Sequence, residues 1–96
     1  MSRKSVLDLL KKHQTELRKL GVRSLALFGS VARDQAGPDS DVDLLVEFME
    51  APNFDRFIDV KIYLEDLIGC RVDLVMPQSV RPQMRPYIEQ DLVYVA

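Results

Sequence analysis

The N-terminal segment carries a stripe of positions at the spacing of one face of an α-helix. The stripe advances in steps of three or four residues, through Val6, Leu10, His13, Leu17 and Leu20. Ser5 and Asp8 resemble a capping box that starts this helix, although a start nearer Ser2 also fits. Gly21 is a candidate left-handed residue at its end. The pattern predicts one continuous helix up to Gly21.

Short apolar runs bounded by turn residues predict strands at residues 24–28, 41–48, 71–76 and 92–95. Asn53 is a candidate N-cap for a second long helix, which ends at Gly69. The apolar stripe of this helix comprises Phe57, Val60, Leu64, Leu67 and Ile68. Helices that alternate with strands predict an α/β fold in which helices pack on a sheet of about four strands.

Three connecting segments are less regular. Residues 29–35 are expected to open a short helix after the first strand, and residues 36–40 contain the Gly, Pro, Asp and Ser of a loop. After Ser79 we expect a short helical stretch, which Pro86 breaks or restarts.

Size and composition indicate one domain over residues 1–96. The 47% hydrophobic content is enough for a core that needs no disulfide. Cys70 is the sole cysteine, which excludes an internal disulfide and favours a reducing environment. No apolar run approaches the ~20 residues that cross a bilayer, and no secretory signal is evident. We therefore expect a cytoplasmic protein without a membrane partner.

The charge pattern argues against nucleic acid as a partner. The chain has 13 basic and 15 acidic residues, for a net charge of −2. Neutralisation of phosphates requires clustered Lys and Arg. The basic residues near the N-terminus are spread around the first predicted helix, so they indicate a solvated face.

Asp41 and Asp43 occupy alternate positions on the predicted second strand. Side chains at such positions leave the same face, so the two carboxylates are expected side by side. Their repulsion raises one pKa unless a cation lies between them, and Mg²⁺ prefers such oxygen ligands. The alternative is a strand end with one solvated Asp and one that caps the loop. The apolar run at 44–46 favours a compensating partner for Asp43.

Asp73 stands between apolar residues on the predicted third strand. If this strand neighbours the second one, Asp73 completes a cluster with Asp41 and Asp43 that is able to hold two metal ions. A salt bridge between Asp73 and Arg71 is the competing interpretation.

Gly29 and Ser30 lie where the first strand turns into the short helix. Such a turn presents backbone N–H groups to an anion such as phosphate, and Ser30 adds a hydroxyl donor. An ordinary turn capped by Ser30 is the alternative. Arg33 either reaches the same phosphate or pairs with Asp34 or Asp39 at the surface.

The combination of these features is more specific than its parts. Gly-Ser at 29–30, ten intervening residues, Asp-Val-Asp at 41–43 and the later Asp73 resemble the signature of the DNA polymerase β nucleotidyltransferase superfamily. Residues 28–33 and 40–46 are similar to its minimal nucleotidyltransferase (MNT) branch. The resemblance implies the polymerase β-like fold, a small mixed sheet with helices packed on it.

The resemblance also implies roles for individual residues. It assigns nucleotide binding to Gly29, Ser30, Arg33 and Ser40. It assigns catalysis, and the binding of two Mg²⁺ ions, to Asp41, Asp43 and Asp73. ATP is the implied substrate, and attack of an acceptor hydroxyl on its α-phosphorus expels pyrophosphate.

Two positions depart from the commonest pattern of the branch. Val31 stands where Arg is frequent, and Asp34 where Gly is frequent. Neither is a metal position, so the departures bear on loop conformation, phosphate contacts and rate more than on the class of reaction.

The implied activity is that of an antitoxin that transfers AMP from ATP to a tyrosine of a partner HEPN-domain RNase toxin. One alternative is an antitoxin that neutralises the toxin by binding alone. Its neutralising effect would persist after Asp41→Asn or Asp73→Asn. Another is a nucleotidyltransferase of a small hydroxylated molecule such as an aminoglycoside, which would need further walls for its pocket.

The remaining candidates favour structural roles. We expect His13 as a core or boundary residue of the first helix and Cys70 as a small buried filler. Met76, Met84 and Tyr87 are expected to cover the sheet in preference to forming an exposed binding surface.

Overall fold

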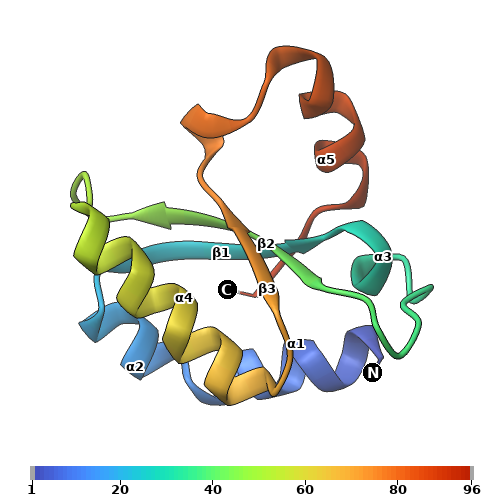
Figure 1. Ribbon diagram of the computed structural model, residues 1–96, viewed down its shortest axis with the longest axis horizontal. Helices are drawn as coiled ribbons and strands as arrows, with labels where there is room; N and C mark the ends of the chain where they lie inside the picture. The colour runs from blue at the N-terminus through green and yellow to red at the C-terminus, as the bar shows by residue number, and fades with distance from the viewer. Residues whose placement is uncertain (1, 96) are drawn as a thin grey trace.

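One mixed sheet, with its strands in the order β3–β2–β1–β4, forms the centre of the computed structural model, which describes residues 2–95 (Figure 1). β1 (Val22–Phe28) lies antiparallel to β2 (Val42–Phe48) and to β4 (Val93–Tyr94). β3 (Val72–Val75) lies parallel to β2. The predicted α/β class, and the small mixed sheet that the family resemblance implies, are confirmed.

Three helices cover one face of the sheet, below it in Figure 1: α1 (Arg3–Lys12), α2 (Gln14–Lys19) and α4 (Phe54–Ile68). The core lies between these two layers. Its fully buried side chains include Leu10, Leu27, Leu44, Val46, Val60 and Leu64. Within residues 2–95, no helix combines the length and the apolar character needed to cross a membrane.

Strand β2 separates the core from the opposite, acidic face of the sheet. Val42, Leu44 and Val46 are fully buried against the helices. Because side chains alternate along a strand, Asp43, Leu45 and Glu47 lie on the other face. Asp43, the candidate catalytic residue of β2, therefore faces away from α1, α2 and α4.

The apolar spacing predicts one continuous helix up to Gly21, and this prediction is wrong. The segment forms two helices, α1 and α2, which are divided at His13. Ser2 is the N-cap of α1, and its Oγ accepts a hydrogen bond from the backbone N of Ser5 at 3.1 Å. The capping box therefore joins Ser2 and Ser5, not Ser5 and Asp8. The ring Nδ1 of His13 lies 2.9 Å from the carbonyl oxygen of Leu9, the oxygen to which the His13 backbone N–H would donate in a continuing helix. This contact accompanies the end of α1, and α2 begins at the next residue.

Helix α4 agrees with the prediction at both ends. Asn53 Oδ1 accepts a hydrogen bond from the backbone N of Arg56 at 2.8 Å, and Gly69 ends the helix at φ +82°. The helix connects β2 to β3, and such a crossover allows the two strands to lie side by side in parallel. Asp41 and Arg71 each lie one residue before their strand instead of within it.

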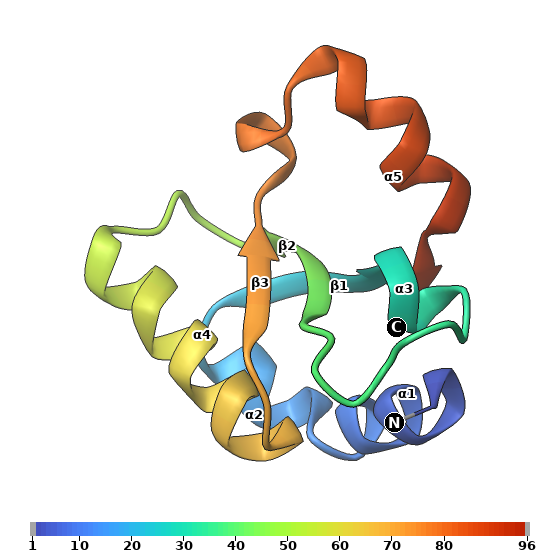
Figure 2. The ribbon, with the colours of Figure 1, turned by 45° about the vertical axis from the view of Figure 1, so that its right-hand side comes forward.

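The C-terminal arch, residues 76–92, crosses the acidic face of the sheet. It comprises the 3₁₀ turns η1 (Pro77–Ser79) and η2 (Pro82–Met84) and the helix α5 (Arg85–Asp91). In Figures 1 and 2 the arch leaves β3 and returns along β1 as β4. Pro86 lies in the first turn of α5, where its missing N–H removes no helical hydrogen bond. Pro86 therefore restarts the helix, which is one of the two predicted outcomes.

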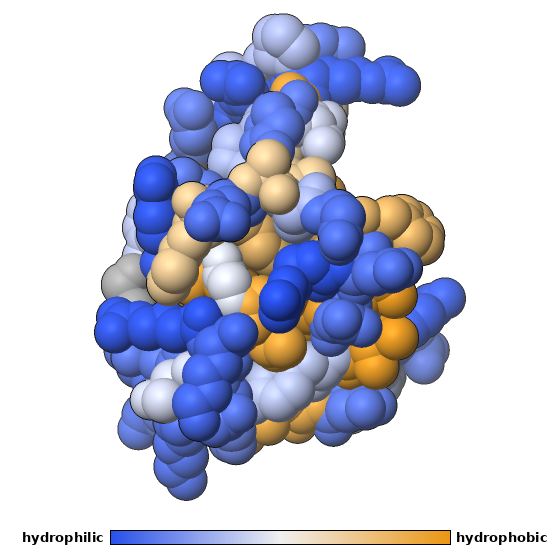
Figure 3. Space-filling view, turned by 90° about the vertical axis from the view of Figure 1, so that its left-hand side faces the viewer, coloured by the Kyte–Doolittle hydropathy of each residue, from blue (hydrophilic) through white to orange (hydrophobic). Residues whose placement is uncertain are grey.

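The arch does not bury all of its apolar residues. Tyr87 is 67% exposed and Met84 is 47% exposed, so the prediction that they cover the sheet is wrong. Met76 packs against the core, as expected. The surface of the arch in Figure 3 is mostly hydrophilic, and most of the visible apolar surface lies below it.

Candidate active site

Asp43 and Asp73 lie beside each other on adjacent parallel strands. They are register partners in the pairing of β2 with β3. The prediction that these two strands are neighbours is confirmed. Asp73 is exposed and Asp43 is half-buried, so the pair opens to solvent from the side of Asp73.

Burial and like charge raise the pKa of Asp43 from 3.8 to about 6. Partial burial is the largest cause, followed by the charges of Asp73 and Asp41. The positive charge of Arg33 acts in the opposite direction. The pair therefore gains from a bound proton or cation near neutral pH.

Asp41 lies at the entry to β2 and turns toward Arg71. Arg71 Nε is 3.2 Å from Asp41 Oδ1, and the Arg71 side chain is 80% exposed. The alternative prediction of a salt bridge between Arg71 and Asp73 is therefore wrong. In the part of the chain that the structure describes, no group of three His, Cys, Asp or Glu side chains has a metal-binding arrangement. The structure thus brings two of the three predicted carboxylates together and pairs the third with an arginine.

Gly29 places the start of α3 (Gly29–Ala32) directly against Asp43. A Cβ atom on Gly29 would lie 2.1 Å from Asp43 Oδ2, and Gly29 has a φ of +73°. Both the space and the backbone conformation therefore require glycine. The expected short helix after the first strand is confirmed, and its first residue contacts the acidic pair.

Ser30 and Ser40 have different surroundings. Ser30 is the second residue of α3 and is half-buried, and its carbonyl accepts a hydrogen bond from the backbone N of Gln35 at 2.8 Å. Ser40 Oγ accepts from the backbone N of Gly37 at 2.9 Å, so Ser40 organises the loop that leads into Asp41.

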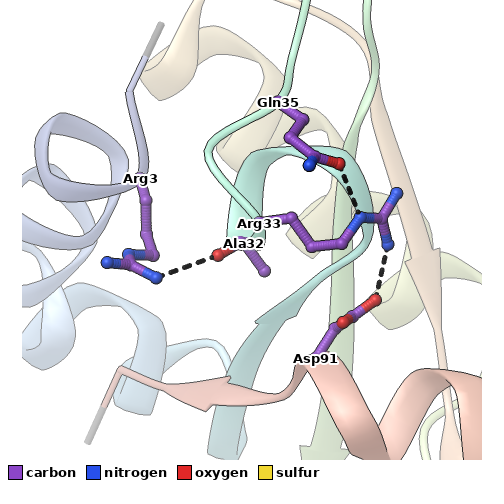
Figure 4. Close-up of polar contacts among 5 residues, drawn as sticks. All are labelled: Arg3, Ala32, Arg33, Gln35 and Asp91. Carbon is purple, nitrogen blue, oxygen red and sulfur yellow. Dashed lines mark hydrogen bonds and ion pairs between the residues drawn. The ribbon is translucent and has the colours of Figure 1, made fainter.

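Arg33 pairs with Asp91 of α5 and with Gln35, not with Asp34 or Asp39 as the surface alternative proposed (Figure 4). Asp91 was not identifiable from the sequence. It lies far along the chain from Arg33, in a segment whose position over the sheet no local pattern reveals.

The two departures from the family pattern have structural explanations. Val31 is fully buried in the core, which suits an apolar side chain. Asp34 has a φ of +59°, in the left-handed region that favours glycine and that Asp also enters. Its Oδ1 accepts a hydrogen bond from the backbone N of Arg3 at 3.1 Å, which stabilises the turn.

The donor set suits a hard divalent cation. Carboxylate oxygens are the ligands that Mg²⁺ prefers, and Asp43 and Asp73 already share one position on the sheet. Asp41 is available as a third donor, because an ion pair as exposed as the one with Arg71 contributes little and exchanges readily.

A cavity of about 340 Å³ lies between the sheet and the C-terminal arch. Its apolar lining includes Leu45, Val80, Ile88, Leu92 and Tyr94. Leu45 follows Asp43 by two residues on β2 and so shares its face of the sheet. The cavity, which the sequence did not predict, therefore opens on the same face of the sheet as Asp43, although neither Asp43 nor Asp73 lines it.

Cys70 and His13 do not take part in this site. Cys70 is half-buried against the core, and burial is the main cause that raises the pKa of its thiol. It packs against the core as expected but is less buried than the filler that the sequence predicts. His13 lies at the boundary between α1 and α2.

The fold and the paired aspartates beside a glycine turn define a nucleotidyl-transferring domain. A family model described as "Nucleotidyltransferase domain" matches residues 10–95. The chain therefore belongs to the nucleotidyltransferase domain family and is an enzyme of that class. The resemblance to the minimal nucleotidyltransferase branch is confirmed by the relatives that follow.

The chain is similar to proteins of that branch over nearly its whole length. It is 45% identical over 89 residues to the protein adenylyltransferase MntA of Thermococcus cleftensis, covering 92% of this chain and 90% of that protein. A solved structure assigned as a minimal nucleotidyltransferase is 31% identical, with a TM-score of 0.82 over 97% of this chain and 95% of that one.

The fold also matches a toxin–antitoxin complex. The complex contains a tri-AMPylated Shewanella oneidensis HEPN toxin with an MNT antitoxin, and the matching chain is 17% identical with a TM-score of 0.67. The match covers 94% of this chain and 71% of that one. At this identity the likeness shows the fold alone.

Proposed function

We propose that this nucleotidyltransferase is an antitoxin that transfers AMP from ATP to a tyrosine hydroxyl of a partner HEPN-type RNase toxin. The observation that carries the proposal is the pairing of Asp43 with Asp73 against Gly29. The name of the Thermococcus relative supports protein as the acceptor, and the tri-AMPylated HEPN toxin supports the kind of partner. The lone Cys70 suits the reducing cytoplasm as the compartment.

Different residues of the chain are proposed to bind the ATP triphosphate and the Mg²⁺ ions. Gly29, Ser30, Arg33 and Ser40 bind the triphosphate. Asp43 and Asp73 would hold Mg²⁺, with two ions proposed, and Asp41 would serve as the third carboxylate. When bound, Mg²⁺ supplies charge neutralisation for the entering and leaving oxygens.

Asp73 is the candidate for positioning and deprotonating the acceptor hydroxyl, because it is exposed beside the half-buried Asp43. The tyrosine oxygen forms a bond to the α-phosphorus while the bond from that phosphorus to the bridging oxygen breaks. Pyrophosphate leaves with the electron pair, and the phenolic proton passes to the carboxylate.

The test is incubation of the protein with its partner toxin, ATP and Mg²⁺, followed by intact-mass measurement of the toxin. We expect added AMP with the wild type and none with Asp43→Asn or Asp73→Asn. Asp59→Asn, the same chemical change at an exposed position of α4, serves as the control and should retain transfer. No added mass with the wild-type protein contradicts the proposal.

Toxin neutralisation separates the catalytic mechanism from binding alone. Asp43→Asn and Asp73→Asn should fail to restore growth in cells that express the toxin, whereas Asp59→Asn should succeed. Neutralisation that survives loss of both carboxylates would instead indicate an antitoxin that works by covering the toxin.

A further inference from the structure

Two acceptors from different parts of the chain hold the side chain of Arg33. Its Nε donates to Oε1 of Gln35 at 3.2 Å, and its Nη1 pairs with Oδ2 of Asp91, the last residue of α5 (Figure 4). The Asp91 side chain is only 18% exposed. A charge-assisted hydrogen bond to a carboxylate that is largely withdrawn from water is stronger than one at an open surface.

The backbone on either side of Arg33 is also held. Arg3 Nη1 donates to the carbonyl oxygen of Ala32 at 3.2 Å, and the backbone N of Arg3 donates to Oδ1 of Asp34 at 3.1 Å. Both the residue before Arg33 and the residue after it are therefore tied to the start of α1. The orientation of the guanidinium then depends on its own two acceptors.

The contacts with Gln35 and Asp91 use Nε and Nη1 of Arg33, which leaves the other terminal nitrogen, Nη2. Among the residues that the structure describes, none accepts a hydrogen bond from Nη2 of Arg33 (Figure 4). Arg33 directly follows α3, and its backbone N donates to the carbonyl oxygen of Gly29 at 3.1 Å. Because Gly29 lies against Asp43, Arg33 is one helical turn from the acidic pair. A fixed cation with a free donor beside this pair is suited to a phosphate oxygen.

We propose that Asp91 and Gln35 are positioning residues that hold Arg33 in the orientation in which it binds the nucleotide triphosphate. This inference rests on the proposed function, in which Arg33 contacts that group. Fixing an arginine side chain costs rotamer entropy. Asp91 and Gln35 impose that order before the nucleotide arrives, so nucleotide binding does not bear the cost. The C-terminal arch thus contributes to nucleotide affinity through a residue that does not touch the nucleotide.

The main test is Asp91→Ala. We expect the KM for ATP in the transfer reaction, and the Kd of a non-hydrolysable ATP analogue measured by calorimetry with Mg²⁺, to rise about two- to tenfold. The kcat should change less, because the phosphate contact is present in both the ground state and the transition state. Asp91→Asn keeps an oxygen acceptor and should show a smaller rise.

Two further variants make the result specific. Glu89→Ala removes an exposed acidic side chain from the same helix and should leave KM and Kd unchanged. Gln35→Ala removes the other acceptor in an exposed turn away from α5, and should raise both constants in the same direction. If Asp91→Ala fails to fold, the Kd and KM of Gln35→Ala alone test whether the acceptors of Arg33 support nucleotide binding.

A double-mutant cycle tests whether Asp91 acts through Arg33. In an Arg33→Ala background, Asp91→Ala should have no further effect on Kd. If Asp91→Ala raises the Kd of the analogue as much in that background as in the wild type, the proposal is overturned. It is also overturned if a folded Asp91→Ala or Gln35→Ala protein binds the analogue with the same Kd as Glu89→Ala. If the wild type binds the analogue but transfers no AMP, the proposed function fails while the calorimetric comparison still decides this inference. If the wild type binds no analogue, both fail.

Discussion

The carboxylate of Asp43 occupies the space that a side chain on Gly29 would need. A Cβ atom there would lie 2.1 Å from Asp43 Oδ2, and the φ of +73° at Gly29 is one that other residues rarely adopt. The turn proposed to bind phosphate and the strand that carries Asp43 are therefore in direct contact. A side chain at residue 29 must therefore displace the Asp43 carboxylate.

Gly29→Ala should remove AMP transfer, and Gly69→Ala is its matched control. Both substitutions place a side chain at positive φ, which costs about 1–2 kcal/mol. Gly69 has no atom within 4 Å of an added Cβ, whereas Gly29 has the Asp43 carboxylate. We expect Gly69→Ala to retain AMP transfer. The rate of AMP transfer by Gly29→Ala should fall about a hundredfold, because displacement of a catalytic group by about 1 Å has an effect of that size. Equal activity of the two variants would contradict this account.

The stability of the metal-free protein should fall as the pH rises through the titration of Asp43. Its pKa is about 6 in the fold, above the ordinary value of 3.8, so the folded state binds this proton more tightly than the unfolded state. The resulting stabilisation is complete below pH 3.8 and is lost by about pH 6. In urea titrations with EDTA, the wild type and Asp59→Asn should lose stability across this range relative to Asp43→Asn. Parallel pH profiles for all three proteins would refute the assignment.

Added Mg²⁺ should stabilise the wild-type protein above the pKa of Asp43, because metal ions bind the deprotonated carboxylates. A ligand at a hundred times its Kd stabilises a fold by about 2.7 kcal/mol. Thermal unfolding at about pH 7.5 should show this increase in Tm for the wild type and Asp59→Asn, and not for Asp43→Asn or Asp73→Asn. If Asp43→Asn keeps the full increase, the ion binds elsewhere.

Arg71→Ala should make Asp41 more available to Mg²⁺ at little cost in stability. The ion pair of Arg71 with Asp41 is exposed, and pairs of this kind contribute at most about 1 kcal/mol. We expect half-maximal transfer at a lower Mg²⁺ concentration than for the wild type. Lys19→Ala, which removes a similarly exposed ion pair with Glu16 on α2, should leave that concentration unchanged. A higher Mg²⁺ requirement for Arg71→Ala would show that Arg71 supports the site instead of competing for Asp41.

Much of the fold was predictable because local residues mark its elements. Asn53 and Gly69 mark the ends of α4, and the alternation along β2 identifies its buried face. The division of the first helix at His13 was not predictable, since the apolar spacing continues through it and the interruption coincides with a side-chain contact to the carbonyl of Leu9.

The site was predictable only in part for a related reason. Asp43 and Asp73 are marked by apolar neighbours on strands that a helical crossover makes adjacent. The partners of two charged residues depend instead on the tertiary arrangement. Arg33 finds Asp91 because the arch returns over the sheet, and Arg71 finds Asp41 because both lie just before adjacent parallel strands. Neither pairing has a signature in local spacing.

The separation of Asp43 and Asp73 by the whole of α4 has a consequence for the life of the protein in the cell. A nascent chain that has emerged only as far as β2, or a fragment that a protease leaves after cutting within α4, carries one half of the acidic pair. AMP transfer by the proposed mechanism would then begin only when synthesis and folding have reached β3.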